Sequence, residues 1–453
     1  MKLYNTLTKQ KEEFKPINGK QAHMFVCGPT VYDYLHIGNG RTAITMDVLV
    51  RLLKHIGYEV DAIMNITDVE DKIIARAAEQ NTDWQSLAQK FETQYLEDMK
   101  SLRVDNFRYV RATEHIDDII NQVQTLLDRA FAYTTDDGIY FEIAKFQGYG
   151  KLSGRDKVAE DDAQSRIDHS DQKRGWNDFC LWKFKKAGEP SWPAPFGDGR
   201  PGWHIEDTAI TEHYFGPQYD IHGGGSDLIF PHHEAELTQM EAASGKVPFV
   251  KYWVHGGLLY ISGKRMGKSN QNFLTIHEMA KNYDPSVIRL MMLQAHYRSQ
   301  LDFSEELLNE AKRRMHRWRN AANLRHQILA TGDEDSAEAL VRARVGLQTA
   351  LEDDLNTPQA FSIIEEAFNV VEQGVPAGAD QAFTKLLATI DAVFGFDLST
   401  QDDVSADIKE LLQKRQTARD SKDWKASDDL RDTIASHSVG VRDTDQGQIW
   451  FRA

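Results

Sequence analysis

The sequence predicts an α/β fold in which a parallel sheet, interrupted by an inserted segment, is followed by a helical region. Three observations lead to this prediction. Apolar runs of strand length alternate with segments of helical periodicity over residues 1–115, and the alternation resumes near residue 201. Residues 116–200 instead show a hairpin pattern around Asp137-Gly138 and an irregular stretch rich in aromatic residues, glycine and proline. Beyond about residue 275 the apolar residues keep helical spacing nearly throughout.

The composition sets the scale of this fold. A chain of 453 residues exceeds what one core holds, so about three domains are expected. The net charge of −16 argues against a generally basic nucleic-acid-binding protein, although it leaves room for a local basic face. Two cysteines, Cys27 and Cys180, give no disulfide framework and fit a reducing compartment. Since no apolar leader or membrane-length segment is present, we expect a cytoplasmic protein without a membrane partner.

The first strand–turn–helix unit predicts a phosphate site. An apolar run over residues 22–27 ends at Gly28-Pro29, and helical spacing begins shortly after His36 and Asn39. At a helix start, unpaired N–H groups and the helix dipole favour phosphate, and Gly38 lets a ligand approach the backbone. The alternative is that the histidine only caps the helix.

A second strand, over residues 58–64, leads to Thr67 and Asp68, and a charged helix follows from about Glu70. Because the carboxyl ends of parallel strands share one edge of the sheet, we expect Cys27, Thr67 and Asp68 to lie together where ligands bind.

Two glycine-containing segments extend this prediction. Residues 219–222 are typical of a strand that runs into a glycine-rich turn, and glycines with an Asp at a strand end suit a ribose and adenine site. Residues 263–270 form a basic segment, predicted to be an exposed, mobile loop, whose Arg265 and Lys268 could close over the same phosphates. A plain strand-to-helix turn and a solvated charged loop are the respective alternatives.

A third group of residues predicts a metal site. Cys27 and Asp207 lie at expected strand ends, and His232 and Glu236 are four residues apart on one helix face. Thiolate, imidazole and carboxylate groups are all zinc ligands. The alternative is that Cys27 acts as a small apolar residue.

These motifs together resemble the cysteinyl-tRNA synthetases, a family of class I aminoacyl-tRNA synthetases. His36-Ile37-Gly38-Asn39 resembles the HIGH signature of the family, and Arg265-Met266-Gly267-Lys268-Ser269 resembles its KMSKS loop. Further similarities lie, in chain order, at residues 65–68, 202–206, 220–227, 230–234, 353–358, 419, 422–424 and 427–431.

The resemblance implies an ATP-dependent ligase that activates L-cysteine and transfers it to tRNA(Cys), with Mg²⁺ on ATP and one Zn²⁺ per subunit. Zinc would bind the thiolate of the substrate cysteine. Serine would be rejected because its hydroxyl is a poor zinc ligand. The implied catalytic residues are His36, Asn39 and Lys268; the ATP-binding residues Gly38, His222, Gly224, Asp227, Arg265 and Lys268; the amino-acid-binding residues Cys27, Gly28, Thr67 and Trp203; and the zinc ligands Cys27, Asp207, His232 and Glu236.

The sequence departs from the family pattern at three of these positions. Asp207 stands where the family usually has a second zinc cysteine, which implies a harder site with one protein thiolate. Arg265 replaces a lysine and preserves its charge, whereas Gly267 replaces a serine and loses a hydroxyl.

The resemblance also implies a domain arrangement. A Rossmann-like catalytic domain comprises residues 1–115 and 201–305, residues 116–200 form a connective insertion, residues 306–395 a helical bundle, and residues 396–453 a small mixed α/β anticodon module. For tRNA contacts we select Arg313, Arg317, Trp424 and Arg431. Arg313 and Arg317 belong to a basic helical segment, and the alternative is that this segment is only a solvent-exposed helix face. For Trp424 the alternative is that its side chain packs in a hydrophobic core. We expect the protein to be a monomer.

Two other functions remain open from the sequence. A related protein could activate cysteine or another amino acid for a small-molecule acceptor, although the C-terminal module favours tRNA. A catalytically silent tRNA-binding relative is the other alternative, and the intact His36, Asn39 and Lys268 argue against it.

Overall fold

The computed structural model describes residues 1–155, 170–265, 273–327, 334–372, 379–444 and 447–452. The chain forms two compact units, one of Met1–Tyr283 with Tyr297–Phe303 and the other of Asp284–His296 with Ser304–Ala453. Among the described helices, none combines the length and the apolarity that a membrane span requires.

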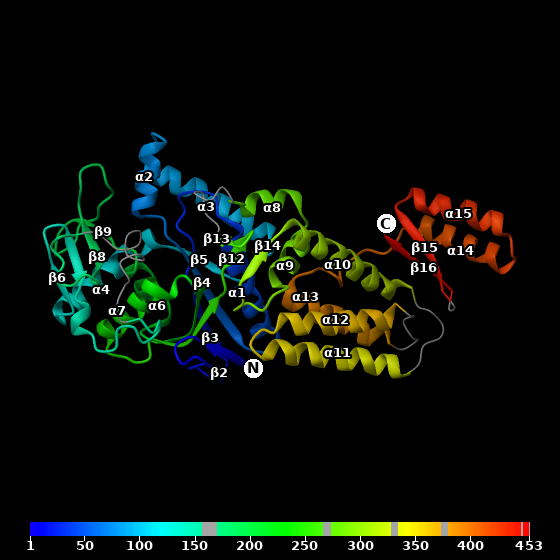
Figure 1. Ribbon diagram of the computed structural model, residues 1–453, viewed down its shortest axis with the longest axis horizontal. Helices are drawn as coiled ribbons and strands as arrows, with labels where there is room; N and C mark the ends of the chain where they lie inside the picture. The colour runs from blue at the N-terminus through cyan, green and yellow to red at the C-terminus, as the bar shows by residue number, and fades with distance from the viewer. Residues whose placement is uncertain (156–169, 266–272, 328–333, 373–378, 445–446, 453) are drawn as a thin grey trace. The chain divides into compact units, whose positions relative to one another are not determined.

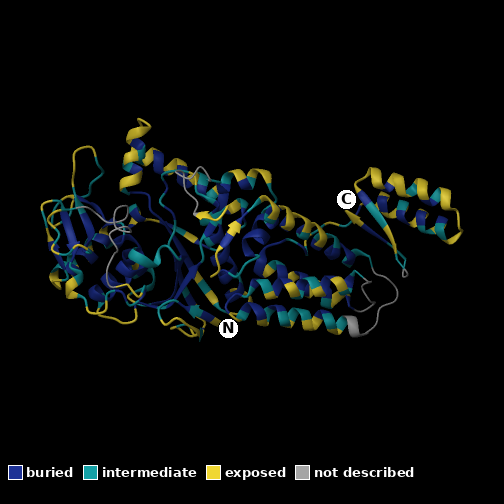
Figure 2. Ribbon diagram, in the orientation of Figure 1, coloured by how far each residue is buried: buried dark blue, intermediate teal, exposed yellow. Residues whose placement is uncertain are grey.

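A five-stranded parallel sheet forms the centre of the first unit (Figure 1). Buried residues run without interruption along much of its inner strands, as expected where both faces of a parallel sheet are covered (Figure 2). The predicted α/β class is therefore confirmed. The strand order is β11 (Val250–Gly256), β10 (Tyr219–Gly225), β3 (Gln21–Val26), β4 (Glu59–Ile66) and β5 (Arg108–Arg111).

The order of these strands determines where a ligand can bind. From β3 the chain continues to β4 on one side, and only much later to β10 on the other side. Open parallel sheets bind ligands at the carboxyl ends of strands where the order reverses in this way. Helix α1 (Ile37–His55) begins just beyond the end of β3, so its N-terminus lies at this point.

Helices and short sheets surround the central sheet of the first unit. The helices are α2 (Asp71–Glu79), α3 (Trp84–Ser101), η1 (Ala112–His115), α4 (Ile116–Asp128), η2 (Ile143–Lys145), α6 (Ile205–Phe215), η3 (Ile229–His233), α7 (Glu234–Ser244) and α8 (Ile276–Asn282). The short strands are β1 (Lys2–Asn5) paired with β2 (Gln10–Glu13), and β12 (Leu259–Ile261) between β13 (Lys264–Arg265) and β14 (Leu301–Phe303).

The inserted segment has its own antiparallel sheet, in the order β6 (Ala132–Thr134), β7 (Gly138–Phe141), β8 (Phe179–Phe184) and β9 (Gly199–Pro201). The predicted hairpin is confirmed by the pairing of Tyr133 with Tyr140. Phe141, Phe179 and Trp182 pack in its core together with residues of α4 and α6. The inserted sheet therefore shares its hydrophobic core with α6 and with residues of α7.

The glycine-rich segment differs from the prediction. Gly223, Gly224 and Gly225 do not form a turn; they belong to β10 and pair with β11, so the predicted turn was wrong. The glycines are required here by close packing against neighbouring side chains and not by a turn of the chain. A Cβ on Gly223 would lie 2.8 Å from Sδ of Met46, and one on Gly224 would lie 2.7 Å from Cε1 of His233.

The second unit is helical and ends in a small mixed module. Its helices are α9 (Pro285–Leu293), α10 (Glu305–Asn323), η5 (Leu324–His326), α11 (Glu334–Glu352), α12 (Thr357–Val371) and α13 (Asp380–Phe394). The module comprises α14 (Ala406–Asp420), α15 (Trp424–Ser436) and a hairpin of β15 (Val439–Thr444) with β16 (Gly447–Arg452). Ile408, Ile434 and Trp450 form part of its core, so the fold contains the helical and mixed C-terminal parts that the sequence predicted.

Candidate active site

A cavity of about 270 Å³ lies at the carboxyl ends of β3, β10 and β11. Its lining includes seven of the residues selected from the sequence, namely Cys27, Gly28, His36, Gly38, Asn39, Trp203 and Asp227. Six others are buried and are not among its lining residues, namely Thr67, Asp207, His222, Gly224, His232 and Glu236. The backbone of Arg265 belongs to β13, and Lys268 lies outside the described residues.

The start of α1 presents His36 to this cavity. His36 is the N-cap residue, and its Nδ1 accepts a hydrogen bond from the backbone N–H of Asn39 at 3.3 Å. Because Nδ1 acts as the acceptor, the proton of a neutral imidazole lies on Nε2, which is then a donor. The capping function and a phosphate-binding function are therefore compatible in one side chain.

Gly38 is required by the position of this imidazole ring. A Cβ on Gly38 would lie 2.9 Å from both Cε1 and Nδ1 of His36, which is closer than real Cβ atoms approach. The glycine thus keeps the ring against the helix start, and this is a tighter requirement than the backbone access that the sequence suggested.

The chain just beyond the basic segment lies against the same helix start. The backbone N–H of Ile37 donates to the carbonyl of Leu274 at 3.0 Å, and that of Ile276 donates to the carbonyl of Leu35 at 3.0 Å. Phe273 lines the cavity. The described residues that follow the KMSKS-like segment are therefore fixed beside His36.

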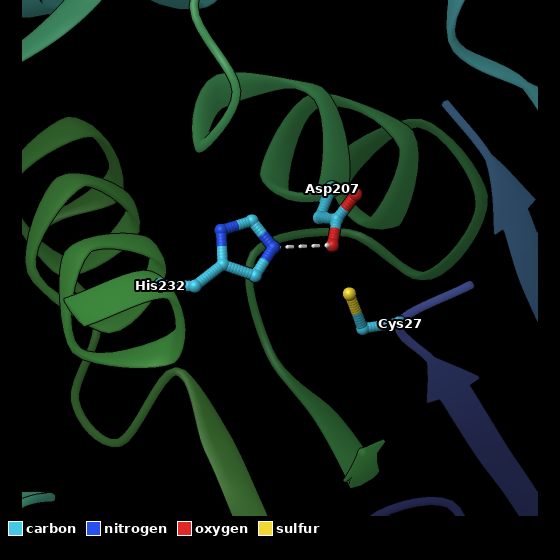
Figure 3. Close-up of side chains that lie close together, drawn as sticks. All are labelled: Cys27, Asp207 and His232. Atoms are coloured by element: carbon cyan, nitrogen blue, oxygen red, sulfur yellow. Dashed lines mark hydrogen bonds and ion pairs between the residues drawn. The ribbon is translucent and has the colours of Figure 1, made fainter. Parts of the chain in front are cut away.

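At the other end of the cavity, three predicted metal ligands meet (Figure 3). One ligand atom each from Cys27, Asp207 and His232 lies within 4.8 Å of the other two. Nε2 of His232 is 3.3 Å from Oδ2 of Asp207 and 3.1 Å from Oε1 of Glu236. Residues of α6, η3 and α7 and the residue that follows β3 thus come close to one another.

Glu236 carries the strongest indication of a cation. Its side chain is fully buried, and among the described residues neither carboxylate oxygen accepts a hydrogen bond of normal geometry, although Nε2 of His232 lies 3.1 Å from Oε1. Burying an unpaired carboxylate is costly unless it is paired with a cation or becomes protonated. Burial first, and the nearby Asp207 second, raise the pKa of Glu236 well above its ordinary value.

The thiol of Cys27 experiences the same environment. Burial raises the pKa of Cys27 well above its usual value, and the charges of Asp207 and Glu236 raise it further. Burial and the two neighbouring carboxylates thus disfavour the thiolate of Cys27 where no positive charge compensates them. A divalent cation supplies that charge and favours the thiolate, so the donor set fits a metal ion.

Sequence reasoning missed the polar residues that surround these ligands. His204 Nδ1 is 2.7 Å from His232 Nδ1, and the ring of Trp203 stacks on His232 with centroids 4.1 Å apart. Burial lowers the pKa of His204 well below its ordinary value, so this ring is neutral. Metal-binding histidines commonly use their second nitrogen for such a hydrogen bond.

His222 and His233 are also part of this buried region. Nε2 of His222 lies 3.5 Å from Oε2 of Glu236, and the ring contacts His233 rather than the cavity. Burial lowers the pKa of His222 and of His233 well below the ordinary value. The structure therefore places His222 beside the candidate metal ligands, away from the lining residues around His36. Its position in β10 gave no signal of this from sequence.

The four residues selected for tRNA contact all lie in the second unit. Arg313 and Arg317 are on the outer face of α10, and Arg317 forms an ion pair with Glu365. Trp424 is 56% exposed at the start of α15 and has the guanidinium of Arg419 5.6 Å from its ring centroid. Its exposure excludes the alternative core role for Trp424. Arg431 is exposed on the same helix and pairs with Asp428.

Comparisons with known proteins agree with this geometry. The family model described as "tRNA synthetases class I (C) catalytic domain" matches residues 13–313, and the model "Cysteinyl-tRNA ligase anticodon binding domain" matches residues 401–450. The cysteine–tRNA ligase of Bacillus licheniformis is 42% identical over 99% of this chain and 98% of its own. That of Thermococcus onnurineus is 43% identical over 100% of this chain and 99% of its own.

A solved structure supports the fold. Mycobacterium tuberculosis methionyl-tRNA synthetase in complex with methionyl-adenylate matches with a TM-score of 0.63 and 12% identity, over 84% of this chain and 93% of its own. The fold and the catalytic-domain match define a class I aminoacyl-tRNA synthetase. Within that class, the identity along the whole chain and the anticodon-domain match show that the protein belongs to the cysteine–tRNA ligase family. The resemblance drawn from the sequence motifs is confirmed.

Proposed function

We propose that the protein activates L-cysteine with ATP and transfers the cysteinyl group to the terminal adenosine of tRNA(Cys). The observation that carries this proposal is one cavity with a helix start at one end and Cys27, among metal-ligating side chains, at the other. A helix N-terminus suits phosphate, and a metal-ligating cluster suits a thiol. The two substrates of the first step thus have adjacent sites.

In the first step, a carboxylate oxygen of cysteine attacks the α-phosphorus of ATP. The bond to the bridging oxygen breaks, and pyrophosphate leaves with the electron pair. His36 donates from Nε2 and Asn39 from its amide to phosphate oxygens, where negative charge concentrates as the bond breaks. Arg265 and Lys268 are proposed to neutralise the departing pyrophosphate, with Mg²⁺ bound to ATP. In the second step, an adenosine hydroxyl attacks the carbonyl carbon and AMP leaves.

The nucleoside and the amino acid are assigned to opposite ends of the cavity. Asp227 lines it just beyond the end of β10, where a carboxylate can accept from ribose hydroxyls. Gly38 is assigned to backbone approach of ATP. Gly224 and His222, which are buried and do not line the cavity, are assigned to support of the ATP site from within the sheet. Gly28, Thr67 and Trp203 are assigned to the amino acid.

Cys27, Asp207, His232 and Glu236 would hold a zinc ion. When bound, zinc prefers the sulfur of cysteine to the hydroxyl of serine, which provides selectivity without an editing step. The chain's own contribution would be a thiol, an imidazole and a carboxylate from Cys27, His232 and Asp207, which lie close together, and a second carboxylate from Glu236, 3.1 Å from His232. Trp203 covers one face of the His232 ring and limits the access of water to it.

For tRNA, we propose that the helical part and the C-terminal module supply the contacts. Exposed Trp424, with Arg419 beside its ring, suits stacking on an unpaired base. Arg313, Arg317 and Arg431 are assigned to phosphate contacts. The domain boundaries expected from the sequence, including an anticodon module over residues 396–453, form part of this proposal.

The decisive experiment is cysteine-dependent exchange of pyrophosphate into ATP by the zinc-supplemented protein, followed by transfer to tRNA(Cys). We expect exchange with cysteine, little with serine, and charging of the tRNA. Failure to exchange with cysteine would refute the activity. Exchange without transfer to tRNA would favour a small-molecule acceptor instead.

A further inference from the structure

Asn65 lies at the junction of the candidate metal ligands. It belongs to β4, next to the last residue of that strand, and its side chain is 1% exposed. The backbone N–H of Gly28 donates to its Oδ1 at 2.6 Å. Because a backbone N–H can only donate, the atom that faces Gly28 is the amide oxygen, and the amide nitrogen points the other way.

The amide nitrogen of Asn65 donates to Oδ1 of Asp207 at 2.7 Å and lies 3.4 Å from Oγ1 of Thr67. The side chain therefore uses its acceptor and its donors on three separate segments of the chain. A fully satisfied amide of this kind is fixed in orientation, and it fixes its partners in turn.

The hydrogen bond to Oδ1 determines which atom Asp207 can offer to a metal. A carboxylate has two oxygens, and Asn65 occupies one of them. The other, Oδ2, faces Nε2 of His232 at 3.3 Å and lies on the side of Cys27 (Figure 3). Asp207 is thereby oriented as a ligand through a single oxygen.

Asn65 also holds the chain that carries Cys27. The peptide between Cys27 and Gly28 supplies the N–H that Asn65 accepts, and the turn packs against the strand without a gap. A Cβ on Gly28 would lie 1.8 Å from the carbonyl oxygen of Asn65. One residue of β4 thus contacts both the segment of the first ligand and the side chain of the second.

We infer that Asn65 is a positioning residue for the metal site, which fixes Asp207 as a single-oxygen ligand and holds Cys27 opposite it. This inference rests on one part of the proposed function, namely that a metal binds at this site. An amide is the group that the position requires, since a carboxylate could not donate to Asp207 and an apolar side chain could neither donate nor accept. Residues that hydrogen-bond a metal ligand typically change metal affinity about 10–100-fold when they are altered.

The test measures zinc affinity by competition with a chromophoric chelator, on the full-length chain and without substrates. Asn65→Asp keeps the acceptor for Gly28 but replaces the donor by a second carboxylate. We expect it to weaken zinc binding about 10-fold or more. Circular dichroism shows whether Asn65→Asp folds. If it does not fold, the zinc affinity of Asn65→Ser is measured in its place.

A matched control exists in the same unit. The amide nitrogen of Asn106 donates to Oδ1 of Asp47 at 2.8 Å, and its oxygen accepts from Lys54 at 2.8 Å. Asn106→Asp therefore makes the same chemical change to an amide–aspartate pair that is not part of the ligand cluster. We expect its zinc affinity to equal that of the unmodified chain.

A second comparison separates positioning from general structural damage. In an Asp207→Cys background, the carboxylate oxygen that Asn65 holds is gone, while a metal-binding atom remains. Asn65→Asp should then lower zinc affinity by less than half the factor seen in the unmodified background. Equal factors in both backgrounds, or an unchanged affinity of Asn65→Asp, would overturn the inference.

The outcomes distinguish this inference from the proposed function. If Asn65→Asp binds zinc normally while the unmodified chain exchanges pyrophosphate with cysteine, the positioning role fails and the activity stands. If the unmodified chain binds no zinc, the inference and the zinc part of the proposed function both fail, and the exchange assay still decides the activity.

Discussion

The two ends of the cavity are built in different ways. At the α1 end, His36, Gly38 and Asn39 lie within four consecutive residues, and their geometry follows from one helix start. At the Cys27 end, the candidate ligands come from the residue that follows β3 and from α6, η3 and α7, and all of them except Cys27 are buried. The first half-site is local and partly open, whereas the second is assembled over long range.

This difference determines what each half-site requires. At the α1 end, the described cap is a hydrogen bond within one helix start, from the backbone N–H of Asn39 to Nδ1 of His36. At the Cys27 end, neither carboxylate oxygen of Glu236 accepts a hydrogen bond of normal geometry among the described residues, and the pKa of Cys27 is raised by burial and by the carboxylates. Of the two half-sites, the second is therefore the one whose donor set fits a bound cation.

The largest expected effect comes from removing the only protein thiolate of the cluster. Cys27→Ala should lower kcat/KM for cysteine in pyrophosphate exchange by more than the roughly 100-fold that changes next to a metal ligand cost, because it removes a ligand itself. Zinc content should fall in parallel, as measured by elemental analysis. Cys180→Ala is the control, since Cys180 is buried in the inserted sheet and its thiol contacts the carbonyl of Trp182. Full activity of Cys27→Ala would contradict the distinction between the half-sites.

A smaller effect is expected at the α1 end. In Gly38→Ala, the new methyl group would displace the ring of His36, and kcat of exchange should fall roughly 10-fold, since small displacements of catalytic groups are costly. Zinc content should stay unchanged, which separates the two half-sites. The control is Gly346→Ala in α11, where the added Cβ meets only ordinary van der Waals contacts. Loss of zinc from Gly38→Ala would show that the half-sites are coupled.

The same contrast explains how far sequence alone could go. His36, Gly38 and Asn39 were found because their function follows from spacing along one helix start. The set of Cys27, Asp207, His232 and Glu236 was proposed from the chemistry of the side chains and the spacing of His232 and Glu236. In the structure Cys27, Asp207 and His232 lie together, and Glu236 contacts His232. Asn65, His204 and His233 were missed as parts of the site, because a buried amide or imidazole between elements leaves no periodic signal. The glycines of β10 were misplaced in a turn, since the packing of Met46 and His233 against them is invisible in sequence.

The smallest expected effect concerns a third polar cluster, which is also assembled over long range but whose carboxylate is half-exposed. Asp71 of α2 pairs with Lys183 of β8 at 2.5 Å and with Arg200 of β9, and so links α2 to the four-stranded antiparallel sheet. Burial alone would raise the pKa of Asp71, but the charges of Lys183 and Arg200 outweigh it and lower the pKa to about 2. An Asp71 pKa that is lower in the folded state stabilises the fold at pH values above the unfolded-state pKa of about 4. This stabilisation is lost as the pH falls toward 2.

Because Asp71 is half-exposed, Asp71→Asn should lower the free energy of unfolding by only about 1 kcal/mol or less at pH 7, and the difference should shrink below pH 4. Urea unfolding at pH 7 and pH 3.5 measures this, with Asp128→Asn as the control for loss of an exposed carboxylate. A destabilisation that persists undiminished at pH 3.5 would mean that Asp71 acts through packing, and that even this cluster resembles the Cys27 end.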